Sequence, residues 1–335
     1  MRTYRVILTV VLLVFILASC DHGVSMETTV HEDGSLEKVM TFENKDSVKN
    51  VLGLRGGNGW EKSVRLKNEK PDTAKTKSKE KEFITTFKKS FASAEAANAE
   101  LASPNDSLFR ITSTFDKKFR WFYTYIYYAD TYHALNRLEY KADDYLTPED
   151  YAFIDRLPGE GAAISKADSF YLSELDKRIF DVYGARAFFE AYYNLGLQIM
   201  QDSKVESRWL DTLNHHKEDI FRMMNDKKDL EDDFMLGVMD SLKIPLPYET
   251  IRKTYQEKYH TLDLTTNFIS TANDGKYKHR INMPWTIVKT NADSTAGNSA
   301  FWSPPAIKFL LKDYTLYAEA RKLNWWAVTT CLTCL

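Results

Sequence analysis

The sequence predicts an α+β protein: a discontinuous β-rich domain, built as a sheet or sandwich, that carries a mainly helical insertion. Apolar and polar residues alternate after residue 24 and again after residue 262, as in half-buried strands. Between these parts, apolar residues recur at helical spacing from Thr147 to about Tyr259. Because no Pro-, Gly- or Ser-rich linker separates this block from its flanks, we favour an insertion over three sequential units.

The composition is that of an ordinary folded protein and excludes several classes. The 335 residues are 44% hydrophobic, 27% charged and 13% aromatic, which argues against a disordered, collagen-like or multi-pass membrane chain. The 45 basic and 47 acidic residues show no basic excess, so we expect no nucleic-acid partner. Three cysteines cannot form a disulfide scaffold.

Residues 1–19 are typical of a lipoprotein signal peptide. Two arginines precede the apolar run Val6–Leu17, which is too short to span a hydrocarbon core of about 30 Å. The next residues, Leu17-Ala18-Ser19-Cys20, resemble a bacterial lipobox, whose cysteine sulfur carries a diacylglyceryl group with acyl chains such as palmitate. We therefore predict that Cys20 is lipidated and anchors a periplasmic protein of the cell envelope. Asp21 resembles an inner-membrane retention signal, which favours the extracytoplasmic face of the inner membrane over the outer membrane.

Residues 20–138 are predicted to form the N-terminal part of the β-rich domain. A hairpin is expected over 24–42, because Asp33-Gly34 tolerates the positive φ of a tight turn. The charged stretch 69–81 is expected to be a solvated loop. Short helices are expected over Asn44–Leu54 and from Ser93, and further strands over 63–67, 83–90, 107–115 and 118–128.

The strand predicted over 118–128 is unusually aromatic. By period two, one of its faces carries five aromatic rings: Phe119, Trp121, Tyr123, Tyr125 and Tyr127. This face predicts either a central core strand or the aromatic wall of a groove for an apolar ligand.

Residues 139–261 are predicted as the helical insertion. Thr147-Pro148-Glu149-Asp150 is a helix start, with Thr147 as the N-cap and proline in the first turn. Ser165 opens a second helix, and further helices are expected over 209–224, over 229–242 and from Tyr248. Residues 262–322 then complete the β-rich domain, with strands expected over 262–270, 277–289, 300–302 and 310–320 and turns at 273–275 and 296–298.

Residues 323–335 are predicted as an apolar, membrane-proximal tail. Arg321 and Lys322 followed by Trp325 and Trp326 are typical of a membrane interface. About 13 residues follow Lys322, fewer than the roughly 20 that a spanning helix needs. The tail is therefore a truncated anchor, a segment that dips into the interface, or a final core strand.

The sequence contains no recognisable catalytic signature, so we expect a protein without enzymatic activity, cofactor or metal. It lacks Gly-x-Ser-x-Gly, a phosphate loop and His-Glu-x-x-His. Glu257 and His260 form a single Glu-x-x-His, whereas a di-iron bundle needs two. Cys331-x-x-Cys334 is a lone pair without a second pair of ligands.

Two stretches resemble a family of uncharacterised bacterial lipoproteins and, more distantly, the LppM-like envelope domains. They are residues 28–35 and a set of segments within 283–321, namely 283–291, Gly297-Asn298, Trp302 and 313–321. The resemblance implies a β-rich domain between a lipid anchor and a C-terminal membrane segment, and it provides no catalytic residues. It covers about a third of the chain and does not include the helical block.

Together these features predict a lipid-anchored extracytoplasmic binding or interaction module of the bacterial cell envelope, without enzymatic activity. Its expected partners are the membrane, reached through the N-terminal anchor and the C-terminal tail, and an unknown envelope protein or lipid. A carrier or sensor of an apolar, lipid-like ligand is the alternative, because of the aromatic face. A hydrolase with an unrecognised site has less support.

Overall fold

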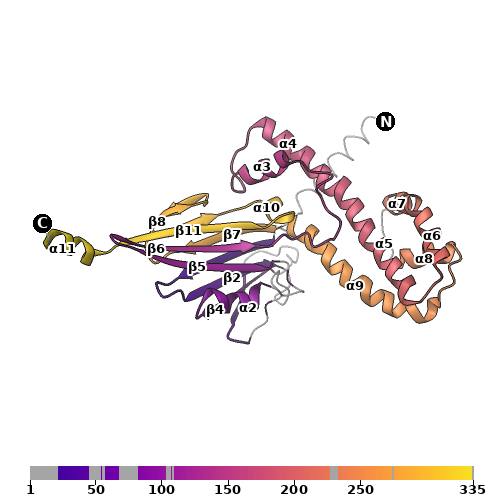
Figure 1. The fold of residues 1–335 in the computed structure, drawn as a ribbon, viewed down its shortest axis with the longest axis horizontal. Coiled ribbons are helices and arrows are strands. Elements are labelled where there is room, and N and C mark those ends of the chain that lie inside the picture. Colours follow the sequence, from indigo (N-terminus) through magenta and orange to yellow (C-terminus); the bar gives the residue numbers. More distant parts are fainter. Residues whose placement is uncertain are drawn as a thin grey trace, which may run out of the picture. The chain divides into compact units, whose positions relative to one another are not determined.

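The computed structural model describes residues 22–44, 57–67, 82–102, 109–226, 233–273 and 275–333, together with Leu54 and Ser107. It confirms the α+β class, with two sheets and a helical segment between strands (Figure 1). The chain divides into two compact units. We call residues 1–135, 157–162 and 271–335 the sandwich unit, and residues 136–156 and 163–270 the helical unit.

The first sheet of the sandwich unit has the strand order β3-β4-β2-β1-β7-β10-β9. In this sheet β1 pairs antiparallel with β2 and parallel with β7, a strand that follows the helical unit in the sequence. The two halves of the β-rich unit are therefore joined at its centre. The strands are β1 (His22–Val30), β2 (Leu36–Asn44), β3 (Glu61–Leu66), β4 (Phe83–Phe91), β7 (Gly275–Asn282), β9 (Ser294–Ala296) and β10 (Ser299–Trp302).

The second sheet has the order β5-β6-β11-β8 and is antiparallel. Its strands are β5 (Ile111–Arg120), β6 (Tyr123–Tyr132), β8 (Thr286–Thr290) and β11 (Tyr314–Leu323). Within the described residues, three helices accompany the two sheets: α2 (Ala94–Leu101), capped by Ser93; α10 (Ile307–Leu310); and α11 (Trp325–Thr333).

The two sheets pack face to face around an aromatic core. The ring of Phe109 makes edge contacts with Tyr132, Tyr277 and Phe309 at centroid distances of 5.2–5.5 Å. Strands of both sheets meet there, because Tyr132 of β6 also contacts His279 of β7. The predicted β-hairpin is confirmed by β1 and β2, whose turn places Gly34 at a φ of 90°.

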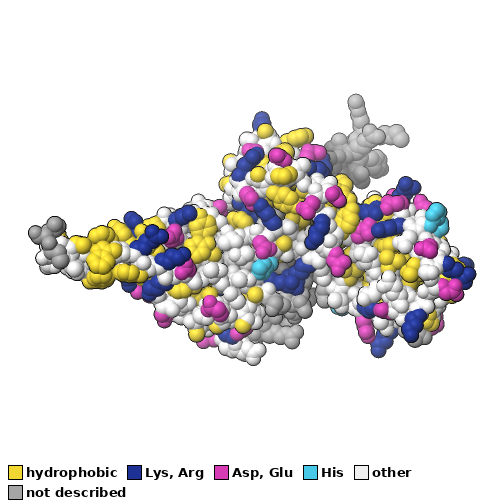
Figure 2. Space-filling view, in the orientation of Figure 1, with side chains coloured by type: hydrophobic (Ala, Val, Ile, Leu, Met, Phe, Trp, Pro, Cys, Tyr) yellow, Lys and Arg dark blue, Asp and Glu magenta, His cyan; other side chains and the backbone are white. Residues whose placement is uncertain are grey.

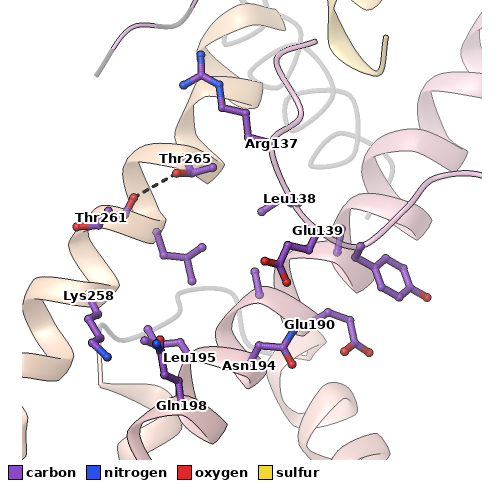
Figure 3. Close-up of a pocket in the computed structure, with 14 residues that line it drawn as sticks. Arg137, Leu138, Glu139, Glu190, Asn194, Leu195, Gln198, Lys258, Thr261 and Thr265 are labelled. Carbon is purple, nitrogen blue, oxygen red and sulfur yellow. Dashed lines mark hydrogen bonds between the residues drawn. The ribbon is translucent and has the colours of Figure 1, made fainter. Parts of the chain in front are cut away.

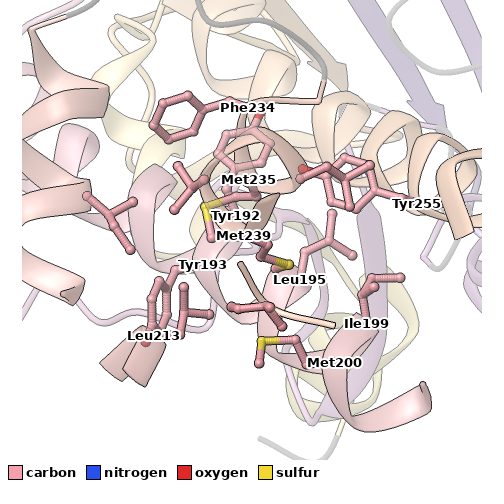
Figure 4. Packing of buried hydrophobic residues seen from close by; sticks show 14 of the residues in the cluster. Tyr192, Tyr193, Leu195, Ile199, Met200, Leu213, Phe234, Met235, Met239 and Tyr255 are labelled. Carbon is pink, nitrogen blue, oxygen red and sulfur yellow. The ribbon is translucent and has the colours of Figure 1, made fainter. Parts of the chain in front are cut away.

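The helical unit contains α3 (Pro148–Arg156), α4 (Lys166–Lys177), a π-helical turn (Arg178–Gly184), α5 (Ala185–Asp202), α6 (Ser207–His215), α7 (Lys217–Asn225), α8 (Phe234–Ser241) and α9 (Tyr248–Asn273). Its core gathers apolar side chains of α5, α6, α7, α8 and α9 (Figure 4). Gly196 allows α8 to lie close to α5, because a Cβ atom there would come within 2.7 Å of the methyl carbon of Met239. The predicted helix starts are confirmed: α3 begins at Pro148, and Ser165 caps α4.

Several predicted elements are corrected by the structure. Residues 262–270, predicted as a strand, belong to α9, because Tyr255, Tyr259 and Leu262 continue one helical face that packs on the core. Proline in the segment 283–285 divides the strand predicted over 277–289 into β7 and β8. The strand predicted over 310–320 begins later, at Tyr314, because Leu310 is the last residue of α10. The helix predicted over 209–224 is two helices, α6 and α7, that meet at His216.

Two predicted segments lie outside the described residues, the helix after Asn44 and the loop over 69–81. The signal peptide and Cys20 lie outside them as well.

Candidate functional site

The aromatic residues predicted to share one strand lie on two strands and the turn between them. β5 extends to Arg120, Trp121 and Phe122 form the turn, and β6 begins at Tyr123. Phe119 therefore belongs to β5, not to the strand that carries the tyrosines. The turn could not be recognised from the sequence, because two aromatic residues replace the usual Gly, Asn or Asp.

The interpretation of this face as core is wrong. Over residues 123–128 of β6 the buried residues are Thr124, Ile126 and Tyr128, which alternate with the three predicted tyrosines. Tyr123, Tyr125 and Tyr127 lie half-buried on the outer face of the second sheet. Phe119 and Trp121 are 59% and 51% exposed.

The structure brings Phe119 and Trp121 together with the C-terminal tryptophans. Trp326 stacks on Phe119, with 5.9 Å between ring centroids and 13° between planes, and meets Trp121 edge-on at 5.2 Å. Trp325 and Trp326 are still 70% and 50% exposed. We call the exposed group at this end of the sandwich the aromatic tip; it comprises Phe119, Trp121, Phe122, Trp325, Trp326 and Leu332.

Asn324 fixes α11 to the β5–β6 turn. Its side-chain amide donates hydrogen bonds to the carbonyls of Arg120 (3.0 Å) and Trp121 (3.1 Å) and accepts one from the hydroxyl of Thr124 (2.9 Å). Its backbone N–H donates to the carbonyl of Phe122 at 2.8 Å. Because Asn324 is buried, these bonds are shielded from water, and they hold the exposed rings in one arrangement.

Lysine and arginine side chains surround the aromatic tip. Figure 2 shows hydrophobic side chains at the α11 end of the sandwich unit and basic side chains beside them. The basic residues on the strands that lead to the tip are Lys117, Lys118, Arg120, Arg321 and Lys322. The described residues after Lys322, up to Thr333, carry no charge. The end of the unit is thus apolar, with a cationic border.

Only part of this positive charge is neutralised by neighbouring acids. Lys322 forms an ion pair with Glu32 at 2.6 Å, and the hydrogen bonds from Lys322 and from Trp285 hold the pKa of Glu32 below its usual value. Lys118 forms an ion pair with Asp116. Arg321 lies over the ring of Tyr123, 4.5 Å from its centroid, with its charge exposed to solvent.

Arg321, Lys322, Trp325 and Trp326 are predicted at a membrane interface, and Phe119 and Trp121 are predicted on a separate aromatic strand. The structure places both at one end of the sandwich unit. It also shows that α11 is a nine-residue helix, not a final core strand. None of the helices within the described residues is long and apolar enough to cross a bilayer.

A groove of about 610 Å³ lies on the outer face of the second sheet. Tyr125, Tyr127 and Tyr317 line it, and Tyr127 stacks on Tyr317 at 5.8 Å. Its other lining residues are polar or charged: Thr114, Asp116, Lys118, Lys289 and Glu319. A lining with this many charges is poorly suited to a wholly apolar ligand.

A second cavity, of about 650 Å³, lies in the helical unit between α5, α9 and residues 137–140 (Figure 3). Leu138, Leu195 and Leu262 form its apolar part. Two of its charged groups already have partners: Glu190 binds Arg186 and Lys217, and Lys258 binds Asp202 at 2.8 Å. Its described lining does not include a nucleophile held by a base.

The interior of the sandwich contains a buried polar cluster. Asp130 accepts hydrogen bonds from Lys38, Ser113, Tyr128 and Thr28. Burial by itself would raise the pKa of Asp130, but Lys38 and the hydrogen-bond donors outweigh this effect and lower it. These residue types occur in catalytic sites, but Lys38 and Asp130 are 2% and 3% exposed, so a substrate could not reach them in this conformation.

In the part of the chain that the structure describes, no three His, Cys, Asp or Glu side chains are placed to hold a metal ion. Comparisons with protein-family models, with curated proteins and with solved structures found no match for this chain.

Proposed function

We propose that this protein is a lipid-anchored, non-enzymatic interaction module of the bacterial cell envelope whose partner is a membrane surface, contacted by the aromatic tip. The observation that carries the proposal is the stack of Phe119, Trp121 and Trp326, held in place by Asn324 yet half exposed to solvent. The lipobox at Cys20 supports the membrane location.

The chemistry of the tip suits a bilayer interface. Tryptophan is enriched at the headgroup level, because its ring is apolar and its N–H can still form a hydrogen bond. Lysine and arginine next to such rings remain in water, where each contributes about 1 kcal/mol of attraction to an anionic surface. The arrangement of Trp325 and Trp326 beside Arg321 and Lys322 combines both contributions.

The expected affinity of the tip alone is modest. Complete burial of a large apolar side chain contributes about 1.5–3 kcal/mol, and interfacial rings are buried only in part. A weak peripheral contact of this kind is sufficient in a lipid-anchored protein, because the acyl chains at Cys20 provide the attachment and the tip adds only a second contact. The tip would therefore add a second membrane contact to a protein that Cys20 already anchors.

Vesicle binding by the chain from residue 20 with Cys20→Ser, which cannot be lipidated, tests the proposal. We expect it to co-sediment with phosphatidylglycerol-containing vesicles and less with phosphatidylcholine vesicles. Trp325→Ser with Trp326→Ser should weaken binding about tenfold or more, because each lost ring removes about 1 kcal/mol.

The matched control is Phe170→Ser. Phe170 is 71% exposed on α4 of the helical unit, so its replacement also removes an exposed aromatic ring. It should leave vesicle binding unchanged. Equal binding by the double tryptophan variant and the parent chain would show that the tip is not the membrane contact.

A further inference from the structure

The N-terminal end of β1 and the aromatic tip lie at opposite ends of the sandwich. Across the interior, β1 and β6 run in opposite directions: the hydroxyl of Tyr132 contacts the sulfur of Met26, and Thr28 donates a hydrogen bond to Asp130 at 3.1 Å. Residues that follow Thr28 therefore lie closer to the tip, and His22 lies farthest from it.

The ion pair between Glu32 and Lys322 confirms this direction, because Glu32 follows β1 and Lys322 is near the tip end of β11. The length follows from the strands. The segment from His22 to Met26 and the segment from Tyr132 to Tyr123 point in the same direction and meet where Tyr132 contacts Met26. At about 3.3 Å per residue, the two segments together are about 40 Å long.

The exposed apolar side chains of the sandwich unit gather towards its two ends. Six of the large ones form the aromatic tip, and Val288 lies on β8 in the half of the sheet nearest to it. The other two that the structure describes, Val64 and Leu66, lie on β3. The strand register places Val64 level with Val24, near the start of β1.

The outer faces of the two sheets are charged and paired. On the first sheet, Glu37 forms an ion pair with Lys88 at 2.9 Å, and Glu27 lies 3.6 Å from Arg280. On the second sheet, Asp116, Lys118, Lys289 and Glu319 line the tyrosine groove, and Lys118 forms an ion pair with Asp116. Faces of this kind stay hydrated, so a sandwich lying flat on a bilayer would bury charge, whereas contact through its ends would not.

We propose that the sandwich unit connects two apposed membranes, with the lipid at Cys20 in one bilayer and the aromatic tip in the interface of a second, anionic bilayer. The inference rests on the function proposed above. Cys20 is two residues from His22, so its lipid enters a membrane within about 7 Å of that end of β1. The tip is then directed away from the membrane that holds the anchor.

Quenching by brominated lipids distinguishes the two membranes. The lipidated protein with Cys334→Ser is labelled at Cys331, a partly exposed residue of α11, with an environment-sensitive fluorophore and reconstituted into phosphatidylcholine vesicles. Protein-free vesicles containing phosphatidylglycerol are then added. Brominated lipid is placed either in the vesicles that hold the protein or in the added vesicles.

We expect quenching when the brominated lipid is in the added vesicles, and a large loss of that quenching with Trp325→Ser and Trp326→Ser. Phe170→Ser should retain it. Quenching only by lipid of the anchoring vesicles would overturn the bridging arrangement while leaving the tip as a membrane contact. The absence of quenching from either side would overturn both this inference and the proposed function.

Discussion

The ammonium of Lys38 lies 2.9 Å from both carboxylate oxygens of Asp130, midway between the two sheets of the sandwich. Lys38 belongs to β2 and Asp130 to β6, so this ion pair joins the sheets through their shared interior. Ser113, Thr28 and Tyr128 complete the hydrogen bonding of the carboxylate. A buried charge is tolerated only where a partner and hydrogen bonds replace its hydration.

Removing one member of this pair should destabilise the protein strongly. Asp130→Ala leaves the Lys38 ammonium buried without its counterion, and we expect the free energy of unfolding to fall by about 3–5 kcal/mol. Replacing both residues, by Lys38→Met and Asp130→Leu, should cost clearly less than the sum of the single changes. Urea unfolding followed by circular dichroism measures these differences. Lys118→Ala, at an exposed ion pair with Asp116, is the control and should cost at most about 1 kcal/mol.

His279 should make the stability of the fold depend on pH. Burial lowers its pKa from 6.5 to about 3, and its Nδ1 lies 2.9 Å from the hydroxyl of Tyr132. The negative charge of Asp130 raises the pKa of His279, and the positive charge of Lys38 lowers it further. As the pH falls below 6.5, the unfolded chain takes up a proton that folded His279 does not. Stability should therefore fall between pH 6.5 and about 3, by up to about 1.4 kcal/mol per pH unit.

Urea unfolding between about pH 4.5 and 6.5 isolates this effect from titration of the carboxylates. In that window His279→Gln and His279→Phe should flatten the pH dependence, whatever their effect on stability at pH 7. Parallel curves for His279→Gln and the parent protein would contradict the assignment to His279.

Asn324 should control the order of α11 without controlling the fold of the sandwich. Asn324→Ala removes two amide donors to the carbonyls of Arg120 and Trp121 and the acceptor for Thr124. We expect faster hydrogen exchange at the α11 amides, weaker vesicle binding and little change in the amides of β6. Unaltered exchange in α11 would show that ring stacking alone holds the helix.

Gly196 should tolerate alanine but not a larger residue. A Cβ atom there would approach the methyl carbons of Met239 (2.7 Å) and Met235 (3.0 Å), which are the ends of flexible side chains and can move. The gain in helix propensity, about 1 kcal/mol, then offsets the rearrangement in Gly196→Ala. Gly196→Leu would overpack the contact between α5 and α8 and should cost about 1–3 kcal/mol.

The matched control is Gly237 on α8, where a Cβ atom would meet no atom within 4 Å. Gly237→Ala should stabilise the protein by about 0.5–1 kcal/mol in thermal unfolding. A larger loss of stability in Gly196→Ala than in Gly196→Leu would contradict the packing described for the α5–α8 contact.

The sequence predicted correctly those elements whose formation depends on residues close together in the chain. The β1–β2 hairpin follows from alternation and Asp33-Gly34, and α3 follows from Thr147 and Pro148, whose capping chemistry acts within one turn. The α+β class follows from two periodicities in separate parts of the chain. The strand predicted over 262–270 is wrong because the pattern of these residues, taken alone, fits either a strand or a helix. The preceding residues of α9 pack on the helical core, and this packing continues the helix through 262–270.

The candidate site required contacts that no local pattern encodes. Phe119 and Trp326 are separated by about 200 residues, and their stacking depends on the pairing of β6 with β11 and on the hydrogen bonds of Asn324. The sequence identified aromatic and basic residues at both places, because those residue types are visible one by one. These residues meet in one exposed surface because strands far apart in the sequence pair with one another, as β1 also does with β7. Such pairings form only when the whole core folds, so no local pattern in the sequence reveals them.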